Sequence, residues 1–343
     1  MAAPFDLGRL ELAGEPAPIL EGVTTRDVTG AGQFSLSGDG ALVYLPTFLP
    51  ERTLMWVAPN GASRPLDETR RGYTSPRLSP DGRRLALMIV EEVTAHIWLY
   101  DLERGALTRL SSGTRDSLPI WTPDGKKVTF QSGSDIVWQA ADGSGAAETL
   151  VSGTGSRVPT SWSPDGSVLV FSDFDAATGF DIWLLSLEGE RKPRAFLQTP
   201  ESELGGVFSP DGRWIAYVSA ASGGLEVYIQ PFPGPGSKSQ VSTEGGTSPI
   251  WARTGREIFY RSEDKMMAVA VETEPALRLS KPRLLFEERL LPEPEGAWGF
   301  AQYDVAPDGE HFVMIREEPL PARIHVVLNW AEELKQQVPA GRH

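Results

Sequence analysis

Apolar positions recur at fixed distances from a series of glycines along the whole chain. An apolar residue stands four positions before each of these marker glycines and another stands three positions after it. The marker glycines are Gly40, Gly82, Gly125, Gly166, Gly212, Gly255 and Gly309, with Leu36, Leu78, Trp121, Trp162, Phe208, Trp251 and Val305 before them and Val43, Leu85, Val128, Leu169, Ile215, Ile258 and Phe312 after them. The flanking segments are also largely apolar at the intervening positions, as expected for strands that are covered on both faces. The pattern predicts seven hairpins of inner strands.

The residues around each marker glycine form a repeated turn phrase. It reads Ser79-Pro80-Asp81-Gly82 and recurs, with Ser, Thr or Ala at the first position, at residues 122–125, 163–166, 209–212 and 306–309. Residues 37–40 and 252–255 are degenerate copies, and the glycines are spaced by 42, 43, 41, 46, 43 and 54 residues. Proline at the second position and glycine at the fourth favour a type I turn with a bulge. A period of this length is typical of β-propeller blades.

Further strands complete the predicted blade. Third strands are expected at Thr53–Val57, His96–Leu102, Asp135–Ala140, Asp181–Leu187, Glu226–Phe232 and Lys265–Val271, and fourth strands at Ala106–Leu110, Ala147–Val151, Pro193–Leu197 and Pro282–Phe286. Four strands per period is the composition of a propeller blade.

The ends of the chain are expected to close the ring. After the last hairpin, Ile324–Trp330 is predicted to be a strand and Ala331–Gln337 a short helix, and Pro16–Gly22 is predicted to supply the missing outer strand. We therefore expect an all-β fold, a single β-propeller domain over 1–343, with seven four-stranded blades, closing strands within 1–22 and a helix and tail at 331–343. In the alternative, Ala2–Leu7 is the third strand in place of Ile324–Trp330. A ring of six blades is then also consistent with the sequence.

Composition restricts the class of partner. The 343 residues include 40% hydrophobic and 23% charged residues, which suits a globular core, and the net charge of −14 disfavours nucleic acid and anionic membranes. No cysteine is present, which excludes disulfides, thiolate nucleophiles and cysteine-ligated zinc but leaves the compartment undetermined. The segment Met1–Pro18 does not have the pattern of a secretory signal, and no apolar run is long enough to insert in a membrane.

The turn phrase followed by a strand such as Asp181-Ile182-Trp183 resembles TolB-like, WD-repeat-related propellers. Five segments are similar to the C-terminal, extracytoplasmic propeller of bacterial membrane-anchored serine/threonine protein kinases, namely Met1–Leu12, Gly189–Arg194, Phe208–Ser219, Glu226–Gly236 and Val326–Lys335. This resemblance implies a periplasmic or extracytoplasmic sensor or scaffold, and an upstream propeller or kinase domain as a partner. It supplies no ligand motif, and because this chain contains no signal-peptide pattern, a cytoplasmic location stays open.

One position of the repeat varies in a way that suggests a ligand site. Nine residues before the marker glycines, the chain carries Ala31, Tyr73, Asp116, Arg157, Glu203, Gly246 and Phe300, and Trp298 lies close by. These residues precede the inner strands, where loops meet at the mouth of a propeller channel. We expect Tyr73, Asp116, Arg157, Glu203, Trp298 and Phe300 to bind an unknown small molecule or protein segment with a cationic or zwitterionic group. Solvated loop ends are the plainer interpretation.

Catalytic and metal motifs are scarce. The chain has no Gly-x-Ser-x-Gly elbow, and its histidines, His96, His311, His325 and His343, do not form a zinc motif. The carboxylates of Asp173, Asp175 and Asp181 depart from the EF-hand pattern, so an ordinary Asp-rich turn is favoured over a calcium site. We therefore predict no catalytic residue, no metal and no cofactor.

Two alternatives to a binding propeller stay open. A metal-assisted hydrolase, lactonase or lyase in the central channel would use carboxylates such as Asp116 and Glu203. A purely architectural role would instead place a large apolar patch near Met1–Leu10 or Leu328–Leu334 for docking a partner domain.

Overall fold

The computed structural model of the chain divides it into two compact units. It describes residues 2–24, 31–46, 51–91, 94–234, 236–287, 300–317 and 323–337. Unit 1 comprises Met1–Leu49 and Pro319–His343, and unit 2 comprises Pro50–Glu318. The single propeller domain over 1–343 stays a prediction, and all the blades of the ring described below lie within Pro50–Glu318.

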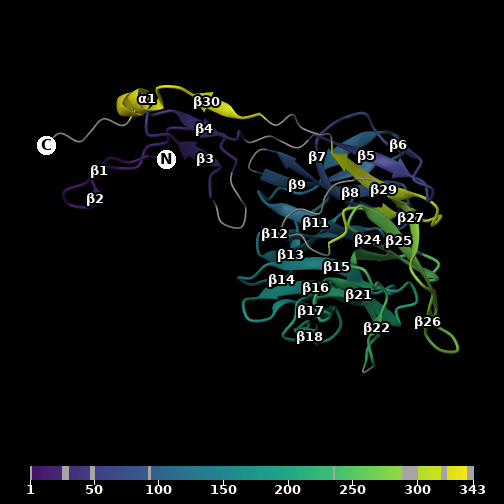
Figure 1. The fold of residues 1–343 in the computed structure, drawn as a ribbon. Coiled ribbons are helices and arrows are strands. Elements are labelled where there is room, and N and C mark those ends of the chain that lie inside the picture. Colours follow the sequence, from purple (N-terminus) through teal and green to yellow (C-terminus); the bar gives the residue numbers. More distant parts are fainter. Residues whose placement is uncertain are drawn as a thin grey trace. The chain divides into compact units, whose positions relative to one another are not determined.

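Unit 2 consists of antiparallel sheets in which most neighbouring strands follow one another along the chain (Figure 1). The first three blades in chain order contain β7 (Gly72–Leu78), β8 (Arg84–Glu91), β9 (Thr94–Asp101) and β10 (Ala106–Arg109); β11 (Asp116–Trp121), β12 (Lys127–Ser132), β13 (Asp135–Ala140) and β14 (Glu148–Val151); and β15 (Arg157–Trp162), β16 (Val168–Asp175), β17 (Gly179–Ser186) and β18 (Pro193–Leu197). The next two contain β19 (Glu203–Phe208), β20 (Trp214–Ser219), β21 (Glu226–Pro231) and β22 (Ser239–Gln240); and β23 (Thr247–Trp251), β24 (Glu257–Ser262), β25 (Lys265–Glu272), β26 (Arg278–Leu279) and β27 (Arg283–Glu287). The last sheet has the order β28 (Asp304–Val305), β29 (Phe312–Glu317), β5 (Arg52–Val57) and β6 (Ser63–Pro65).

The buried side chains show that these sheets form a closed ring of six blades. Each hydrophobic cluster in the described residues joins one blade to the next, and together the clusters connect the blades in a circle. The last interface joins Phe259 of β24 to Phe312 of β29, with ring centroids 5.1 Å apart, and the first joins Val313 of β29 to Leu85 of β8. The all-β propeller is confirmed, and the expected count of seven blades is corrected to six.

One of the seven predicted hairpins, at residues 34–44, does not belong to the six-bladed ring. The reason is that two third strands are exchanged relative to the prediction. β5, expected to follow the first hairpin, pairs with β29 of the last hairpin, with Met55 opposite Met314. In Figure 1, β29 in yellow accordingly lies against β5 near the start of the colour scale. The ring is thus closed by strands from the N-terminal side of the chain, as predicted. These strands are Arg52–Val57 and Ser63–Pro65, and not Pro16–Gly22, which forms no strand. β5 is apolar on both faces, so it gains most by lying between two blades.

The repeated turn is built as its sequence predicts. In the first complete copy, Ser79 Oγ donates to Asp81 Oδ1 (2.5 Å) and accepts from the backbone N–H of Arg84 (2.9 Å), while Gly82 has a φ of +70°. A Cβ at Gly82 would also lie 2.7 Å from Pro307, the proline of the preceding blade's turn. Positive φ and this close approach both require glycine, so the turn and the spacing of neighbouring blades depend on the same residue.

Unit 1 is a smaller assembly of the two chain ends. A hairpin of β1 (Phe5–Asp6) and β2 (Glu11–Leu12) precedes a three-stranded sheet with the order β3 (Phe34–Leu36), β4 (Leu42–Tyr44) and β30 (His325–Val327), followed by α1 (Trp330–Gln337). The predicted C-terminal helix is confirmed. In the described residues, no helix is both long and apolar enough to cross a membrane.

Candidate ligand site in the propeller channel

The inner strands of all six blades enclose a cavity of about 460 Å³. Most of its walls are apolar or carry hydroxyl groups, because the inner strands present aliphatic residues and prolines there. The wall residues used below are Arg77 of β7, Ile120 of β11, Ser161 of β15, Val207 of β19, Ile250 of β23 and Asp304 of β28. This volume falls in the range of small-molecule sites, roughly 300–1,000 Å³.

Irregular backbone shapes the wall of this cavity. Ser75, Leu118 and Ser248 occupy equivalent positions and have φ between 51° and 56°, a conformation that non-glycine residues rarely adopt. At each of these positions the register between the inner strand and the second strand shifts. The bulges turn the inner strands locally, and such strain is concentrated at functional sites.

Neighbouring blades hold one of these bulges in place. Thr74 Oγ1 and the backbone N–H of Ser75 donate to the side-chain oxygen of Gln302, at 2.6 and 2.9 Å. Gln302 precedes β28, and all three residues are buried. The strained backbone is therefore fixed by a polar contact between the first and last blades.

A small group of charged residues interrupts the apolar wall. Arg77 donates from Nη1 to the carbonyl oxygens of Pro76 (2.8 Å) and Tyr303 (3.0 Å), and Asp304 accepts from the backbone N–H groups of Leu78 (2.7 Å) and Val305 (2.8 Å). Among the described residues, Nε and Nη2 of Arg77 have no hydrogen-bond partner. This leaves two donors of a channel-lining guanidinium available to a ligand.

Burial shifts the pKa values of Arg77 and Asp304 in opposite directions. It lowers the pKa of the Arg77 guanidinium, and the nearby Asp304 carboxylate opposes that decrease. It raises the pKa of the Asp304 carboxyl, against the effects of Arg77, of two backbone N–H groups and of the more distant Arg253. Burial thus disfavours the charged form of each group, and in such a poorly solvated position an electrostatic contact is stronger than in bulk water.

Arg253 completes the charged group from the turn of another blade. Its guanidinium donates to the carbonyl oxygens of Pro80 (2.5 Å) and Ser79 (3.1 Å), across the intervening turn of the last blade. It replaces the proline of the repeated turn phrase, so the ring of turn prolines at this end of the cavity is broken at one point by a cation.

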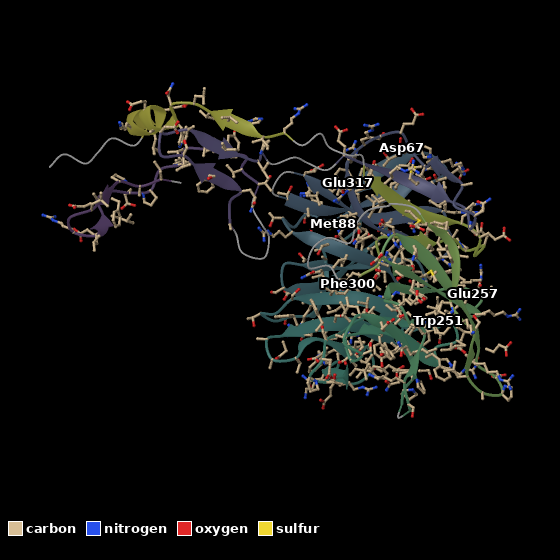
Figure 2. All side chains as sticks on the ribbon, viewed as in Figure 1. Asp67, Met88, Trp251, Glu257, Phe300 and Glu317 are labelled. Carbon is tan, nitrogen blue, oxygen red and sulfur yellow. The ribbon has the colours of Figure 1, made fainter. Side chains whose placement is uncertain are left out.

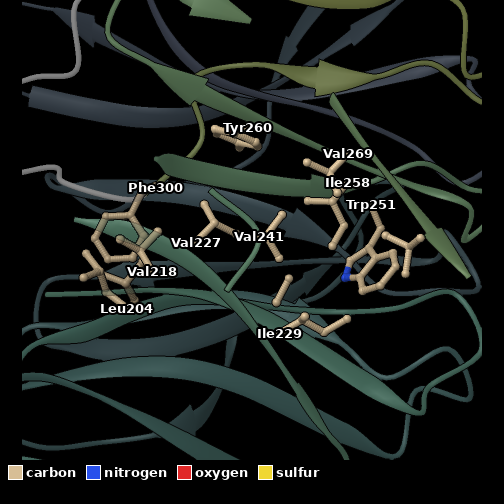
Figure 3. Close-up of a cluster of buried hydrophobic side chains, with 13 residues drawn as sticks. Leu204, Val218, Val227, Ile229, Val241, Trp251, Ile258, Tyr260, Val269 and Phe300 are labelled. Atoms are coloured by element: carbon tan, nitrogen blue, oxygen red, sulfur yellow. The ribbon is translucent and has the colours of Figure 1, made fainter. Parts of the chain in front are cut away.

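The predicted apolar site residues have different positions from one another. Tyr73 is buried in the core between two blades, so it does not offer the accessible surface that we expected from its sequence position. Phe300 lines the cavity and packs edge-on against Phe180, with ring centroids 5.8 Å apart. Its ring belongs to a buried hydrophobic cluster that also contains Leu204 and Val218 (Figures 2 and 3). Trp298 lies outside the described residues.

The predicted polar residues lie at the starts of three adjacent inner strands. Asp116 and Glu203 are buried, and Arg157 forms an ion pair with Asp173 at 2.9 Å. Among the described residues, both carboxylate oxygens of Asp116, Nη1 of Arg157 and Oε2 of Glu203 are buried without a hydrogen-bond partner. Such groups are rare in folded proteins and require an explanation, such as an ordered water or a bound group.

Close packing confines these polar groups. A Cβ at Gly113 would lie 2.4 Å from Oδ1 of Asp116, so a larger residue there would displace that carboxylate. Burial raises the pKa of the Glu203 carboxyl, and hydrogen bonds from Thr199 and Ser219 oppose that increase. Asp116 and Glu203 are therefore buried polar residues at the starts of their strands, and Arg157 is partly buried.

Sequence reasoning missed the charged residues of the cavity, although the repeat carries a signal for them. Position −5 from the marker glycine lines the cavity in every blade of unit 2, with Arg77, Ile120, Ser161, Val207, Ile250 and Asp304. Charge occurs there only in the two adjacent blades that meet at the ring closure. The replacement of proline by Arg253 in the turn phrase is the second signal.

The acidic loop after β16 has the contacts of an ordinary turn. Asp173 pairs with Arg157, Asp175 accepts from the backbone N–H of Ala177 (2.8 Å), and Asp181 accepts from Thr178 (2.9 Å). In the part of the chain that the structure describes, no three His, Asp or Glu side chains are grouped to hold a metal ion.

Comparison with known proteins shows a likeness between the ring and TolB propellers. Residues 59–173 match the model of the TolB beta propeller domain. The chain is 28% identical over 237 residues to the uncharacterized protein Atu1656 of Agrobacterium fabrum, covering 62% of this chain and 77% of that protein.

Solved structures show the same fold at low sequence identity. A TolB candidate from Agrobacterium tumefaciens has a TM-score of 0.64 at 17% identity, covering 79% of this chain and 99% of that one. TolB from Acinetobacter baumannii has a TM-score of 0.53 at 19% identity, covering 70% of this chain and 65% of that one, so the match spans under two thirds of its length. An oligogalacturonate lyase in complex with manganese has a TM-score of 0.51 at 12% identity, covering 84% and 97%. Identities this low establish the fold alone.

Proposed function

Because the chain carries a TolB-like β-propeller, we propose that its ring is a non-catalytic binding module and that the ligand occupies the central channel. The observation that carries the proposal is the 460 Å³ cavity, which draws its wall from all six blades and combines apolar surface with one charged group. Apolar pockets with a few convergent polar groups are the usual form of a ligand site.

The composition of the wall supports binding over chemistry. Among the described residues that line the cavity there is no histidine, and the one carboxylate, Asp304, already accepts two backbone hydrogen bonds. An acid and base pair at hydrogen-bonding distance, which general acid–base catalysis needs, is not formed by these residues.

The charges favour a ligand with an apolar body and a carboxylate. Two arginines face one aspartate at this site, although the whole chain has a net charge of −14. A guanidinium with two unused donors matches a carboxylate in geometry as well as in charge. A short apolar peptide segment that ends in a free carboxylate fits both features, with its body against Val207 and Ile250 and its carboxylate towards Arg77 and Arg253.

The residues predicted at the channel mouth remain part of this proposal at the opposite end. Phe300 contacts the cavity, and Asp116, Arg157 and Glu203 start inner strands at the same end of the ring. Their unpartnered atoms are suited to water-mediated contacts with a ligand that extends beyond the cavity. We also propose an extracytoplasmic location, supported by the likeness to TolB and testable by cell fractionation.

The test compares N-acetyl-Leu-Leu as the free acid with its amide in a thermal unfolding assay. The free acid is expected to raise the Tm of the wild type, because a ligand that binds only the folded state stabilises it, and the amide is expected to raise it less. Arg253→Ala should abolish the difference. Arg256→Ala, an exposed arginine on the same hairpin but outside the cavity, is the matched control and should retain it.

Three results would contradict the proposal. Equal stabilisation by the acid and the amide would show that the ligand carboxylate is not recognised. An equal loss of the Tm difference in Arg253→Ala and Arg256→Ala would show that the effect depends on overall charge. No stabilisation of the wild type by either compound would remove the proposed ligand class.

A further inference from the structure

One aromatic side chain lies across the end of the channel cavity where the inner strands begin. Phe300 precedes β28 of the last blade, and its ring contacts Phe180 of β17, with ring centroids 5.8 Å apart. β17 belongs to the third blade in chain order, which lies opposite the last blade in a ring of six. The contact therefore crosses the channel from one side to the other.

Other apolar side chains complete the obstruction at this end. Phe300 is 6% exposed and belongs to the same hydrophobic cluster as Val158 of β15 and Leu204 of β19, which are 3% and 2% exposed. Figure 3 shows the ring of Phe300 beside Leu204. Leu118 of β11 lines the cavity and packs against this cluster. Side chains from the second, third, fourth and last blades thus obstruct the end of the cavity at the strand starts.

The opposite end of the cavity, at the repeated turns, is exposed. The second residue of five turn phrases lines the cavity there, and it is exposed or partly exposed in every case; these rim residues are Pro80, Pro123, Pro164, Pro210 and Arg253. The wall is therefore mostly buried at the strand starts and accessible at the turns. This difference indicates that the cavity opens on the face formed by the repeated turns, here named the turn face.

The rim of this opening combines apolar rings with one cation. Four of the five rim residues are prolines, whose rings expose CH₂ groups and whose nitrogens carry no hydrogen-bond donor. Among the described rim residues, Arg253 carries the one charge, and Arg77 lies further inside, three positions earlier in the repeat. An apolar segment that ends in a carboxylate would pass an apolar rim and meet Arg253 before Arg77.

We propose that the turn face is the surface on which the partner docks, and that an extended polypeptide end enters the channel there with its carboxylate first. The identity of this ligand rests on the proposed function, whereas the position of the entrance rests on Phe300 and the exposed rim. The entrance lies at the other end of the inner strands from the channel mouth that we expected from the repeat.

A single engineered thiol tests the entrance without a ligand, because the chain has no cysteine. Ser161→Cys places this thiol on the cavity wall of β15, and its rate of reaction with iodoacetamide is followed by mass spectrometry. In that background, Pro164→Trp adds bulk at the turn after β15 and should slow the reaction about tenfold or more, because the indole narrows the entrance. The matched control, Ser156→Trp, adds the same bulk at an exposed residue before β15 and should leave the rate within about twofold.

A second rim variant guards against a local folding effect. The turn accepts a residue other than proline, since Arg253 occupies the equivalent position in another blade, and a Tm measurement checks that each variant folds. Pro210→Trp, at the equivalent exposed position of the next blade, should slow the reaction in the same way. An unreactive thiol in the Ser161→Cys protein, an unchanged rate in either proline variant, or an equal decrease in Ser156→Trp would overturn the proposed entrance.

The peptide acid separates the entrance from the proposed function. In stopped-flow measurements, the association rate of N-acetyl-Leu-Leu should decrease about tenfold or more in Pro164→Trp and stay unchanged in Ser156→Trp. Slower thiol labelling without slower association would overturn entry of the carboxylate end at the turn face. A thiol that reacts through the turn face in a protein that does not bind N-acetyl-Leu-Leu would support the entrance and overturn the peptide as its ligand.

Discussion

Two copies of the same hairpin differ in which side chains they bury. Leu36 of β3 and Leu78 of β7 occupy the same repeat position, four residues before the marker glycine, yet Leu36 is 53% exposed and Leu78 is 4% exposed. Three residues after the glycine, Val43 is partly exposed, whereas Leu85 is fully buried. The local sequence builds both hairpins, but burial depends on whether other blades complete the stack.

The comparison teaches that ring closure, and not hairpin formation, is the source of stability. Hydrogen bonds within a turn contribute modestly, about 0.5–1.5 kcal/mol each, whereas a buried leucine contributes several times that. A chain with seven matching hairpins can therefore form a ring of six and leave one hairpin incomplete.

The largest change in the free energy of unfolding is expected when the two compared leucines are replaced by alanine. Leu78→Ala should destabilise unit 2 by about 2–5 kcal/mol, because it opens a cavity in a closed core. Leu36→Ala, its matched control, should cost unit 1 less than about 1 kcal/mol, since that side chain is already half exposed. Chemical denaturation combined with hydrogen exchange separates the two units, and equal effects would show that Leu36 is buried in solution.

The next effect tests the polar contact at the ring closure. Gln302→Ala should destabilise unit 2 by about 1–3 kcal/mol, because it leaves the hydroxyl of Thr74 and the N–H of Ser75 buried and unpaired. Hydrogen exchange of the Ser75 amide should increase most. Gln302→Glu keeps an acceptor in place and serves as the control for volume; unchanged protection of Ser75 in the alanine variant would contradict the assignment.

A smaller effect of opposite sign is expected at Glu203. Its pKa is raised above the ordinary value of 4.5 by burial, so the folded state holds the proton more tightly than the unfolded state. The free energy of unfolding should therefore decrease as pH rises from about 4.5 through the raised pKa. Glu203→Gln should remove this dependence and stabilise the ring by up to about 1 kcal/mol at neutral pH.

Thermal unfolding across pH 4 to 8 checks the sign of this effect. The neighbouring Glu201→Gln, at an exposed position, is the control and should leave the pH profile unchanged. A destabilising Glu203→Gln would show that the carboxylate is paired in solution.

The smallest effect is expected when the turn serines are replaced by alanine, and it should be equal in the two units. Ser163→Ala removes the donor to Asp165 (2.5 Å) and the acceptor for the N–H of Val168 (2.9 Å), and should cost about 0.5–1.5 kcal/mol. In unit 1, Ser37→Ala removes the donor to Asp39 and the acceptor for the N–H of Ala41, and should speed exchange of the Ala41 amide. If the amide of Ala41 exchanges at an unchanged rate, the turn in unit 1 does not form independently.

Some residues of the candidate site could be predicted from the local sequence, and others only from the tertiary structure. Phe300 was predicted, and it lines the cavity because its repeat position leads into an inner strand. Arg77 and Asp304 were not predicted, since the repeat shows that position −5 is shared but does not show that its side chains converge on one axis. Tyr73 was misjudged because the sequence before an inner strand does not show that a neighbouring blade covers it.

By itself, the sequence determined the all-β class, the hairpins, their turns and the C-terminal helix, because each depends on residues close together in the chain. The tertiary structure decided the number of blades, the exchange of third strands that places β5 beside β29, and the burial of the channel charges. These features depend on which apolar faces find a covering layer. Hydrophobic burial is non-directional, so a local pattern shows that a face must be covered without showing which distant strand will cover it.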